Sequence, residues 1–370
     1  MNRLSIDDIL RGTEPGRMQS VGHMQVIPLL GDDDDRFAAP EVEVRTTAYG
    51  TVELRHDDDR PTIIPPGAGW VVDQAAQDHA IGGGVLLAGK SLAKVDTARC
   101  IQRSQAGYIE AAKHPMLVLP AALRPQALAI RKQTGHGMLW DPITQFNKAF
   151  GVTEAGHLEY FLRRFKAELD QFVAEFELLP RQLGAIVLVD GAIAGVERTP
   201  SSSFWRALWE PLIRVCYGSL AIQRGQGCSA PPSTRIPLAS HGAGTVAQLR
   251  LALAESQVRE RRVVAAVVQQ LRDVDLRAAD KADQVLNRAQ LITLASTELA
   301  GQIVREGDRV AYASLCAAEL REVSLEREPT AAREPAYEPE PASETEPQAN
   351  AACSNDQPTW FERLRGWLRG

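Results

Sequence analysis

Cysteine is scarce in this chain, and its few copies do not form a motif. The 370 residues include five cysteines and no CxxC pair, at Cys100, Cys216, Cys228, Cys316 and Cys353. Scattered thiols that are odd in number predict neither a disulfide framework nor a zinc site. We therefore expect a reducing, cytoplasmic setting and no bound metal.

Long apolar runs are missing as well. The first residues, MNRLSIDDILRG, lack the roughly 7–15-residue apolar core of a signal peptide, and no run approaches the roughly 18 apolar residues of a membrane span. Hydrophobic residues still make up 44% of the chain, enough for ordinary globular cores. We expect a soluble protein, with peripheral contact to a membrane left open.

An excess of positive charge and the familiar catalytic motifs are also absent. The net charge is −6, which argues against a nucleic-acid partner, because such proteins concentrate positive charge against phosphates. Neither GxSxG nor HExxH occurs. His56, His79 and His136 are interpreted as surface or loop residues rather than catalytic ones. The catalytic residues and the cofactor, if any, stay unknown.

The stretch Leu183–Glu197, LGAIVLVDGAIAGVE, organises the first part of the chain. Two apolar runs flank Asp190-Gly191, which predicts a β-hairpin with strands near 184–189 and 192–197. An apolar stripe before it predicts one helix of about 25 residues capped at Thr153. The stripe consists of Leu158, Phe161, Leu162, Phe165, Leu169, Phe172, Val173 and Phe176. After the hairpin, FWRALWEPLIRVCYGSLAI predicts another helix, with Ser201, Ser202 or Ser203 as its cap.

These elements predict an α+β fold: a β-rich N-terminal domain with amphipathic helices around the hairpin. We assign residues 1–22 to a polar leader, 23–223 to the α+β domain and 224–244 to a Gly-, Pro- and Ser-rich linker. Two acidic runs, Asp32–Asp35 and Asp57–Asp59, lack the Gly and distal Glu of a calcium loop, so solvated turns are favoured over cation sites.

The composition changes after the linker. Between Thr245 and Ala300 there is no Gly or Pro, and Ala, Leu, Val, Arg and Gln dominate, as in long helices. Residues 245–323 are therefore predicted to form an all-α hairpin or bundle. Its narrow apolar stripes could be buried against a second copy or against the first domain, and we expect this region to form a homo-oligomer.

The end of the chain is predicted to be a flexible spacer followed by a binding helix. Residues 324–358 are rich in Glu, Pro, Ala and Ser and predict a disordered spacer. Residues 359–370 predict an amphipathic docking helix whose apolar face consists of Trp360, Phe361, Leu364, Trp367 and Leu368. So short a helix is marginal in water, so it should fold on something else. A groove on a protein partner, an anionic membrane surface and the protein's own domain are the three alternatives.

One motif matches a phosphate-binding loop. Gly84–Ser91, GVLLAGKS, fits GxxxxGK[ST], but its apolar residues favour a strand over a phosphate cradle. Farther along, a strand would aim Arg99, Arg103 and Gln105 at one face, either lining an anion or ligand pocket or facing water. The predicted ligand-binding residues are Lys90, Ser91, Arg99, Arg103 and Gln105.

Five pieces of the sequence together resemble a known family. They are MQVIPLL, VLLAGKSLAKVDTARCIQRSQ, QTGHGMLWDPITQFNKAFGV, LLPRQLGAIVLVDGAIAGVE and FWRALWEPLIRVCYGSLA, within residues 23–223. In this order they are similar to the ARG and rhodanese-phosphatase-superfamily-associated domain of bacteria. The family pattern has an acid after its glycine and a Gln-Asn-Arg-like triplet, whereas here Lys90 follows Gly89 and the nearest counterparts are Arg99 and Gln102. The resemblance implies an α+β domain linked to nucleotide or ADP-ribose-related systems, and no particular reaction.

Two hypotheses for function follow. The first is a non-enzymatic ligand-sensing or adaptor protein that self-associates and docks a partner through its C-terminal helix. The second is an enzyme or pseudoenzyme acting on a nucleotide or ADP-ribose-like phosphorylated ligand.

Overall fold

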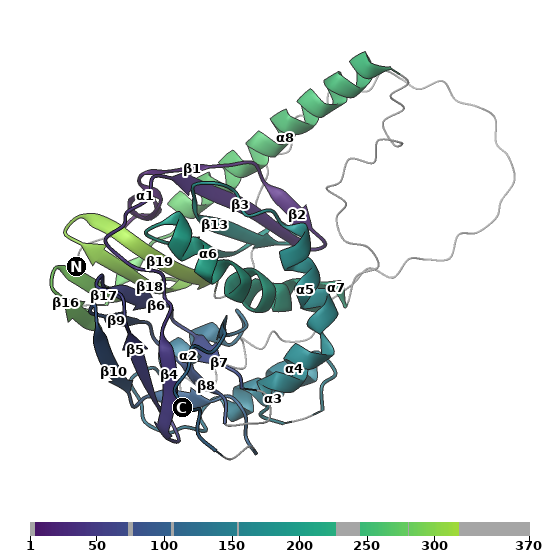
Figure 1. Cartoon of the computed structure of the whole chain (residues 1–370). Helices are drawn as coiled ribbons and strands as arrows, with labels where there is room; N and C mark the ends of the chain where they lie inside the picture. The colour runs from purple at the N-terminus through teal and green to yellow at the C-terminus, as the bar shows by residue number, and fades with distance from the viewer. Residues whose placement is uncertain are drawn as a thin grey trace, which may run out of the picture.

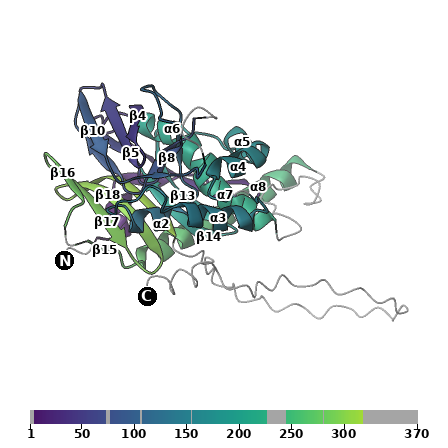
Figure 2. The same cartoon turned by 90° about the horizontal axis from the view of Figure 1, so that it is seen from below.

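The computed structural model describes residues 4–72, 77–104, 107–153, 155–226, 245–279 and 281–317. A large antiparallel sheet forms its centre (Figures 1 and 2). Its strands are β1 (Thr13–Pro15), β2 (Gln19–Val21), β3 (Met24–Gly31), β13 (Gln182–Val189), β14 (Ala192–Arg198), β15 (Arg277–Ala278), β16 (Gln284–Leu286), β17 (Ala289–Ala295), β18 (Leu299–Glu306) and β19 (Arg309–Ala317). Their order is β1-β3-β13-β14-β19-β18-β17-β15, with β2 paired to β3 and β16 to β17.

The β-hairpin predicted around Asp190-Gly191 is confirmed as β13 and β14. Asp190 has φ of 52° and Gly191 of 76°, the left-handed pair that a two-residue turn of the right twist requires. The Asp190 carboxylate also lies 2.6 Å from His23 Nδ1, which ties the turn to the start of β3. All eight residues of β13 are buried, because β13 has strands on both sides and helices over both faces.

The all-α region predicted for residues 245–323 is wrong over most of its length. Helix α8 (Val246–Arg272) forms, but residues 277–317 contribute β15–β19 to the central sheet. In β19 the residues alternate: Ala313 and Leu315 face one apolar cluster, while Tyr312 and Cys316 face the other. The sequence is rich in alanine there because the strand is packed between two layers, and alanine content alone imitates a helix.

One face of the sheet is covered by helices from the middle of the chain. They are α5 (Lys166–Glu175), α6 (Ser202–Glu210), the π-helix η1 (Pro211–Tyr217) and α7 (Gly218–Gly225). The predicted cap is confirmed at Ser201, whose hydroxyl accepts the Phe204 N–H. Pro211 has no N–H to donate to the preceding turn, so the α-helical hydrogen-bond ladder is interrupted where η1 begins.

The opposite face is covered by α1 (Ile6–Leu10) and the second half of α8. Ile6, Ile9, Val267 and Leu271 are fully buried in this layer. Residues 6–21, which the sequence suggested as a polar leader, thus form α1, β1 and β2. Among the described helices, none has both the length and the hydrophobicity needed to cross a bilayer.

A second layer of small antiparallel sheets lies beside the central one (Figure 1). Its strands are β4 (Glu43–Ala48), β5 (Thr51–His56), β6 (Thr62–Ile64), β7 (Ala68–Trp70), β8 (His79–Ile81), β9 (Val85–Leu87), β10 (Ser91–Val95), β11 (Ala98–Cys100) and β12 (Met116–Val118). Its helices are α2 (Arg124–Ala129), α3 (Trp140–Ala149) and α4 (Leu158–Arg164). The mixed α and β content predicted for this part of the chain is confirmed.

The helix of about 25 residues predicted before the hairpin is two helices. It breaks at Phe165 between α4 and α5, and α4 begins after His157 rather than at Thr153. The break lies near the point where the helices pass from one apolar cluster to another. Phe161 and Phe165 pack in the first cluster, and Phe172 packs in the second.

A buried ion pair joins the two layers. Arg124, the first residue of α2, donates from Nη1 to Glu197 Oε1 of β14 at 2.8 Å and from Nη2 to Ser314 Oγ of β19 at 2.5 Å. The Tyr217 hydroxyl at the end of η1 donates to the same Glu197 oxygen at 2.7 Å. Arg124 and Glu197 are only 5% and 1% exposed. Gly195 makes room for this contact, because a Cβ there would lie 2.1 Å from the Tyr217 hydroxyl oxygen.

We expect Arg124→Met to lower the free energy of unfolding by about 3–5 kcal/mol, because Glu197 would keep its charge in the core without its cation. Urea unfolding followed by circular dichroism measures this. Arg277→Met, which removes an exposed pair with Asp275, is the control and should change stability little. Equal effects of the two substitutions would contradict the assignment.

Candidate functional site

The phosphate-loop motif forms a turn between two strands. Gly84–Ser91 contains β9 and continues into β10, so no helix N-terminus follows the motif. Lys90 has φ of 48°, and its Nζ lies 2.5 Å from Asp59 Oδ1. Ser91 Oγ donates to the Ala88 carbonyl at 2.6 Å. Both side chains therefore serve the turn in this structure.

Two of the other predicted ligand-binding residues, Arg99 and Arg103, have different surroundings from this turn and from each other. Arg99 on β11 is buried, and its Nη2 donates to the carbonyls of Ile130 and Gln133 at 2.7 Å each. Burial lowers the pKa of this guanidinium. Arg103 is exposed and reaches the ring of Trp140, with its Cζ 5.9 Å from the ring centroid. Gln105 lies outside the described residues.

An imidazole and a thiol meet where β8 pairs with β11. His79 Nδ1 lies 2.7 Å from the Gln77 carbonyl, so this nitrogen carries the proton. Its Nε2 accepts the Gly50 N–H at 3.2 Å and lies 3.4 Å from Cys100 Sγ. Burial lowers the pKa of His79 to about 4 and raises the pKa of Cys100 to about 12. At pH 7 roughly one thiol in 10⁵ would be ionised, so the pair is a neutral contact and not an activated nucleophile.

Buried amides surround this pair. Gln77 Nε2 donates to the Gln102 carbonyl at 3.1 Å, and Gln102 Nε2 donates to Glu159 Oε2 at 2.7 Å. The side-chain oxygens of Gln77 and Gln102 are buried and have no hydrogen-bond partner among the described residues. Buried acceptors left in this state are destabilising by about 1–3 kcal/mol each, which marks the segment before Arg103 as a candidate binding region.

Four rings form a continuous row on the adjoining surface. The centroids of Tyr108 and Tyr49 are 5.4 Å apart, those of Tyr49 and His136 5.8 Å, and those of His136 and Trp140 5.5 Å. Arg103 continues the row beyond Trp140. Tyr49 and Tyr108 are 44% and 51% exposed. We call Tyr108, Tyr49, His136, Trp140 and Arg103 the ring row.

The backbone holds the ring row against the buried pair. The Cys100 N–H donates to the His136 carbonyl at 2.8 Å, and the Ala98 N–H donates to the Gly50 carbonyl at 3.0 Å. Gly50 has φ of 80° and lies so close to His136 that a Cβ would be 3.1 Å from the His136 Cβ. The segments that carry Tyr49 and His136 are thus fixed to β11, which holds the middle of the row in place.

Sequence reasoning found only Arg103 of the ring row. The four rings come from the β4–β5 turn, a loop, a second loop and the start of α3, so no spacing in the sequence links them. His136 is a loop residue, as predicted, but its neighbours have no signal in the sequence. The same prediction is wrong for His56 and His79, which are buried in β5 and β8 because their strands pack inside the small sheets.

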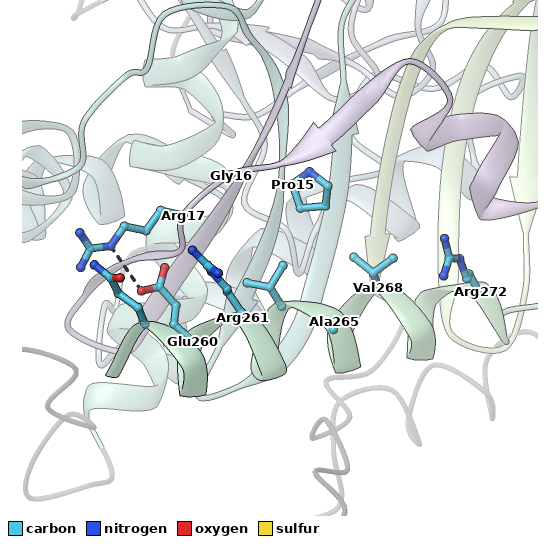
Figure 3. A pocket seen from close by; sticks show the side chains of 10 residues that line it. Pro15, Gly16, Arg17, Glu260, Arg261, Ala265, Val268 and Arg272 are labelled. Carbon is cyan, nitrogen blue, oxygen red and sulfur yellow. Dashed lines mark hydrogen bonds and ion pairs between the residues drawn. The ribbon is translucent and has the colours of Figure 1, made fainter. Parts of the chain in front are cut away.

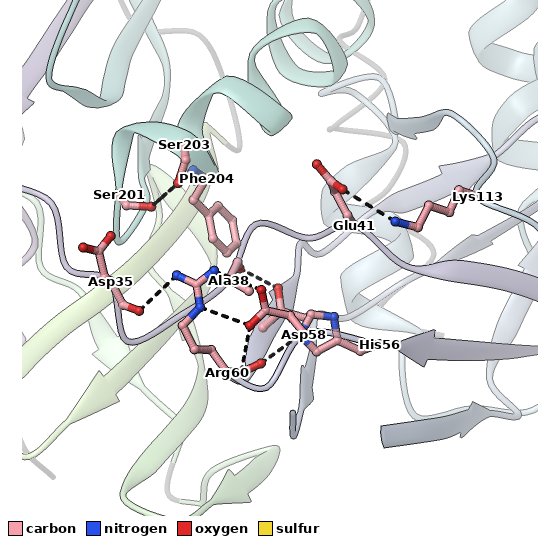
Figure 4. A network of polar contacts seen from close by, with 11 residues as sticks. Asp35, Ala38, Glu41, His56, Asp58, Arg60, Lys113, Ser201, Ser203 and Phe204 are labelled. Carbon is pink, nitrogen blue, oxygen red and sulfur yellow. Dashed lines mark hydrogen bonds and ion pairs between the residues drawn. The ribbon is translucent and has the colours of Figure 1, made fainter. Parts of the chain in front are cut away.

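Residues of both acidic runs make hydrogen bonds or ion pairs within the fold. Arg60 donates to both carboxylate oxygens of Asp58 and to the carbonyl of Asp35, while His56 Nε2 lies 2.8 Å from the Arg60 carbonyl (Figure 4). The hydrogen bond from Arg60 holds the pKa of Asp58 well below its usual range.

In the first run, Asp33 accepts the Ser202 N–H at 2.7 Å at the start of α6. Asp34 accepts from Arg36 and lies 3.2 Å from Arg309. Within the described part of the chain, no three His, Cys, Asp or Glu side chains gather as they would around a metal ion.

The comparison with protein families agrees with the resemblance noted in the sequence. The model of the ARG and Rhodanese-Phosphatase-superfamily-associated Protein domain matches residues 12–302. The chain belongs to this family. The match extends past the 23–223 expected from the sequence and takes in α8 and the strands β15–β17. No curated protein and no solved structure matches the chain.

The C-terminal prediction stays a prediction. The docking residues Trp360, Phe361, Leu364, Trp367 and Leu368, like the spacer 324–358, lie outside the described residues.

The buried imidazole should make stability depend on pH. The pKa of His79 is about 4 in the folded protein and about 6.5 when unfolded, so the unfolded chain binds more protons between these values. Stability is therefore full above pH 6.5 and falls as the pH drops toward 4, by up to about 3 kcal/mol from this residue. Urea unfolding at several pH values should show a shallower dependence in His79→Gln. His114→Gln, at an exposed histidine, is the control, and identical slopes in all three proteins would contradict the assignment.

Proposed function

We propose that this protein is a non-enzymatic ligand-sensing adaptor that binds a planar, phosphorylated ligand of the nucleotide or ADP-ribose type on the ring row. The observation that carries the proposal is the row of four rings ending at Arg103, of which Tyr108, Tyr49 and His136 are exposed and Trp140 is half-buried. Aromatic faces stack on bases whatever their identity, and a guanidinium at the end of such a row suits a phosphate.

The chemistry beside the row favours binding over catalysis. Cys100 and His79 are the possible nucleophile and base that adjoin it, and burial keeps both neutral. Arg99, the nearest buried cation, donates to backbone carbonyls and so supports the loop that follows α2. A row whose middle is held in place needs little reorganisation there on binding, which favours affinity.

Calorimetric titration of the full chain with AMP and with ADP-ribose tests the proposal. We expect binding, weakened about ten-fold or more by Tyr49→Ala, because stacking contributes about 1–3 kcal/mol per base. His136→Ala should have a similar effect, and Arg103→Ala should weaken phosphorylated ligands more than adenosine.

Tyr160→Ala is the matched control, since Tyr160 is an exposed tyrosine on α4 outside the row. Loss of affinity equal to that of Tyr49→Ala would refute the ring row as the site. Product analysis after incubation completes the test, because turnover of either ligand would favour the alternative of an enzyme.

Self-association through α8 is the second part of the proposal. The first half of α8 extends beyond the sheet (Figure 1). Val246 and Leu251 there are 67% and 62% exposed. Val246, Leu249 and Leu253 continue, at three- and four-residue steps, the stripe by which Val267 and Leu271 pack on the sheet. We name residues 246–258 the α8 arm, and its uncovered stripe suits the arm of a second copy.

Sedimentation velocity of the full chain should give a dimer or larger species, and Leu249→Glu with Leu253→Glu should give a monomer, because charge on the stripe prevents its burial. Arg259→Glu changes the net charge by the same amount away from the stripe and should leave the assembly intact. A monomeric wild-type chain would overturn this part.

The docking helix at residues 359–370 completes the adaptor. When it is free, the spacer over residues 324–358 would reach about 30 Å, enough for Trp360 and Trp367 to meet a protein partner beyond their own domain. Aromatic anchors of this kind carry most of the energy in small interfaces.

A further inference from the structure

A groove runs between α8 and the strand β1 at the edge of the central sheet (Figure 3). It is an open groove with a volume of about 620 Å³, next to a second hollow of about 220 Å³, and both are lined by Pro15, Val268 and Arg272. Val264 and Ala265 extend the apolar part of the wall. The volume lies in the range of built ligand sites, so a chain segment of a few residues fits.

The groove carries an excess of positive charge. Its walls include Arg11, Arg17, Arg261 and Arg272, against the carboxylates of Asp7 and Glu260. Three of these arginines are already paired, because Arg11 lies 2.5 Å from Asp8, Arg17 lies 3.3 Å from Glu260, and Arg272 lies 2.8 Å from Asp7. Arg261 has no ion pair or hydrogen bond to any described residue, so its charge is available to a ligand.

We propose that the acidic segment of the same chain that follows β19, residues 318–346, lies in this groove. The segment holds nine glutamates and three arginines, a net charge of −6, with Leu320 and Val323 near its start. Glutamates match the charge of Arg261, and the two apolar side chains match the Val264 and Val268 surface.

A segment that follows β19 is long enough to reach the groove. Ala317, the last described residue, packs on the apolar cluster that α8 covers, on the face of the sheet along which the groove lies. Four strand-to-strand steps separate β19 from β1, about 19 Å at 4.8 Å each. Nine extended residues span about 30 Å, so the glutamates of residues 319–326 can meet Arg261.

The end helix is a poorer occupant. Residues 359–370 hold three arginines and one glutamate, so their charge has the same sign as that of the groove. A tethered acidic segment also has an effective concentration in the millimolar range, which a separate acidic peptide would need to exceed.

Zero-length cross-linking of the full chain tests the proposal. Arg261→Lys places an amine in the groove, and carbodiimide joins it to any carboxylate in contact. We expect mass spectrometry to find Lys at position 261 joined to glutamates within residues 319–346, roughly ten-fold more often than Lys in the matched variant Arg250→Lys, which lies on the α8 arm outside the groove. The native pair Lys166–Asp170 reports that the reaction worked in folded protein.

Cross-linking a mixture of ¹⁴N- and ¹⁵N-labelled chains shows whether the segment in the groove comes from the same chain or from a second copy. Links within one isotope only support the same chain, whereas mixed-isotope links mean that a second copy supplies the segment and overturn the proposal. Equal links at positions 261 and 250, or none to residues 319–346 while Lys166–Asp170 is linked, overturn it as well.

Discussion

The ion pair between Arg124 and Glu197 is the contact on which the two layers of this protein depend. Arg124 begins α2 in the layer of small sheets, while Glu197 and Ser314 lie on β14 and β19 of the central sheet. Desolvating a lone charge this deeply would be prohibitive, so the layers must meet in one register that satisfies it. The π-helix contributes Tyr217 to the same carboxylate, and Gly195 leaves the space through which Tyr217 reaches it. A buried pair of this kind specifies the arrangement of the layers more than it stabilises them, because apolar side chains of the same size would pack as well.

Local signals in the sequence predicted local structure well. Asp190-Gly191 specified the hairpin because few residue pairs tolerate two left-handed conformations, and Ser201 specified the start of α6 because its hydroxyl satisfies a free N–H. The strands β15–β19 could not be recognised in the same way. These strands lack a clear alternation of apolar and polar residues, because both faces of the sheet are buried. Their alanines fit beneath the helices on each side. What decided their structure was the free edge of β14, a partner more than 100 residues away in sequence.

In the candidate site, too, the sequence predicted local features but not the contacts between distant segments. The sequence drew attention to Arg99 and Arg103 by their alternation on one strand, and the structure separates them: Arg99 turns inward to backbone carbonyls, and Arg103 turns outward to Trp140. The polar centre and the ring row are built by pairing β8 with β11 and by the loops that lean on them. Such a site has no signature in one sequence, because its members share a surface and not a segment. The burial that keeps Cys100 and His79 neutral also places them as a packed base beside the ring row.

Helix α8 shows how a buried half and an exposed half of one element depend on each other. An isolated helix as short as the α8 arm would be marginal in water, because nucleation is unfavourable and few hydrogen bonds follow it. Here the packed residues from Val263 to Leu271 supply the nucleus, and Thr245 with Gln248 closes the far end in a capping box. The arm is therefore a helix before it meets anything, so a partner that binds its stripe need not offset the entropy of folding it. The same second half of α8 forms one wall of the arginine-lined groove. A segment held in that groove would lie against the root of the arm, so occupation of the groove and assembly through the arm would act on a single helix.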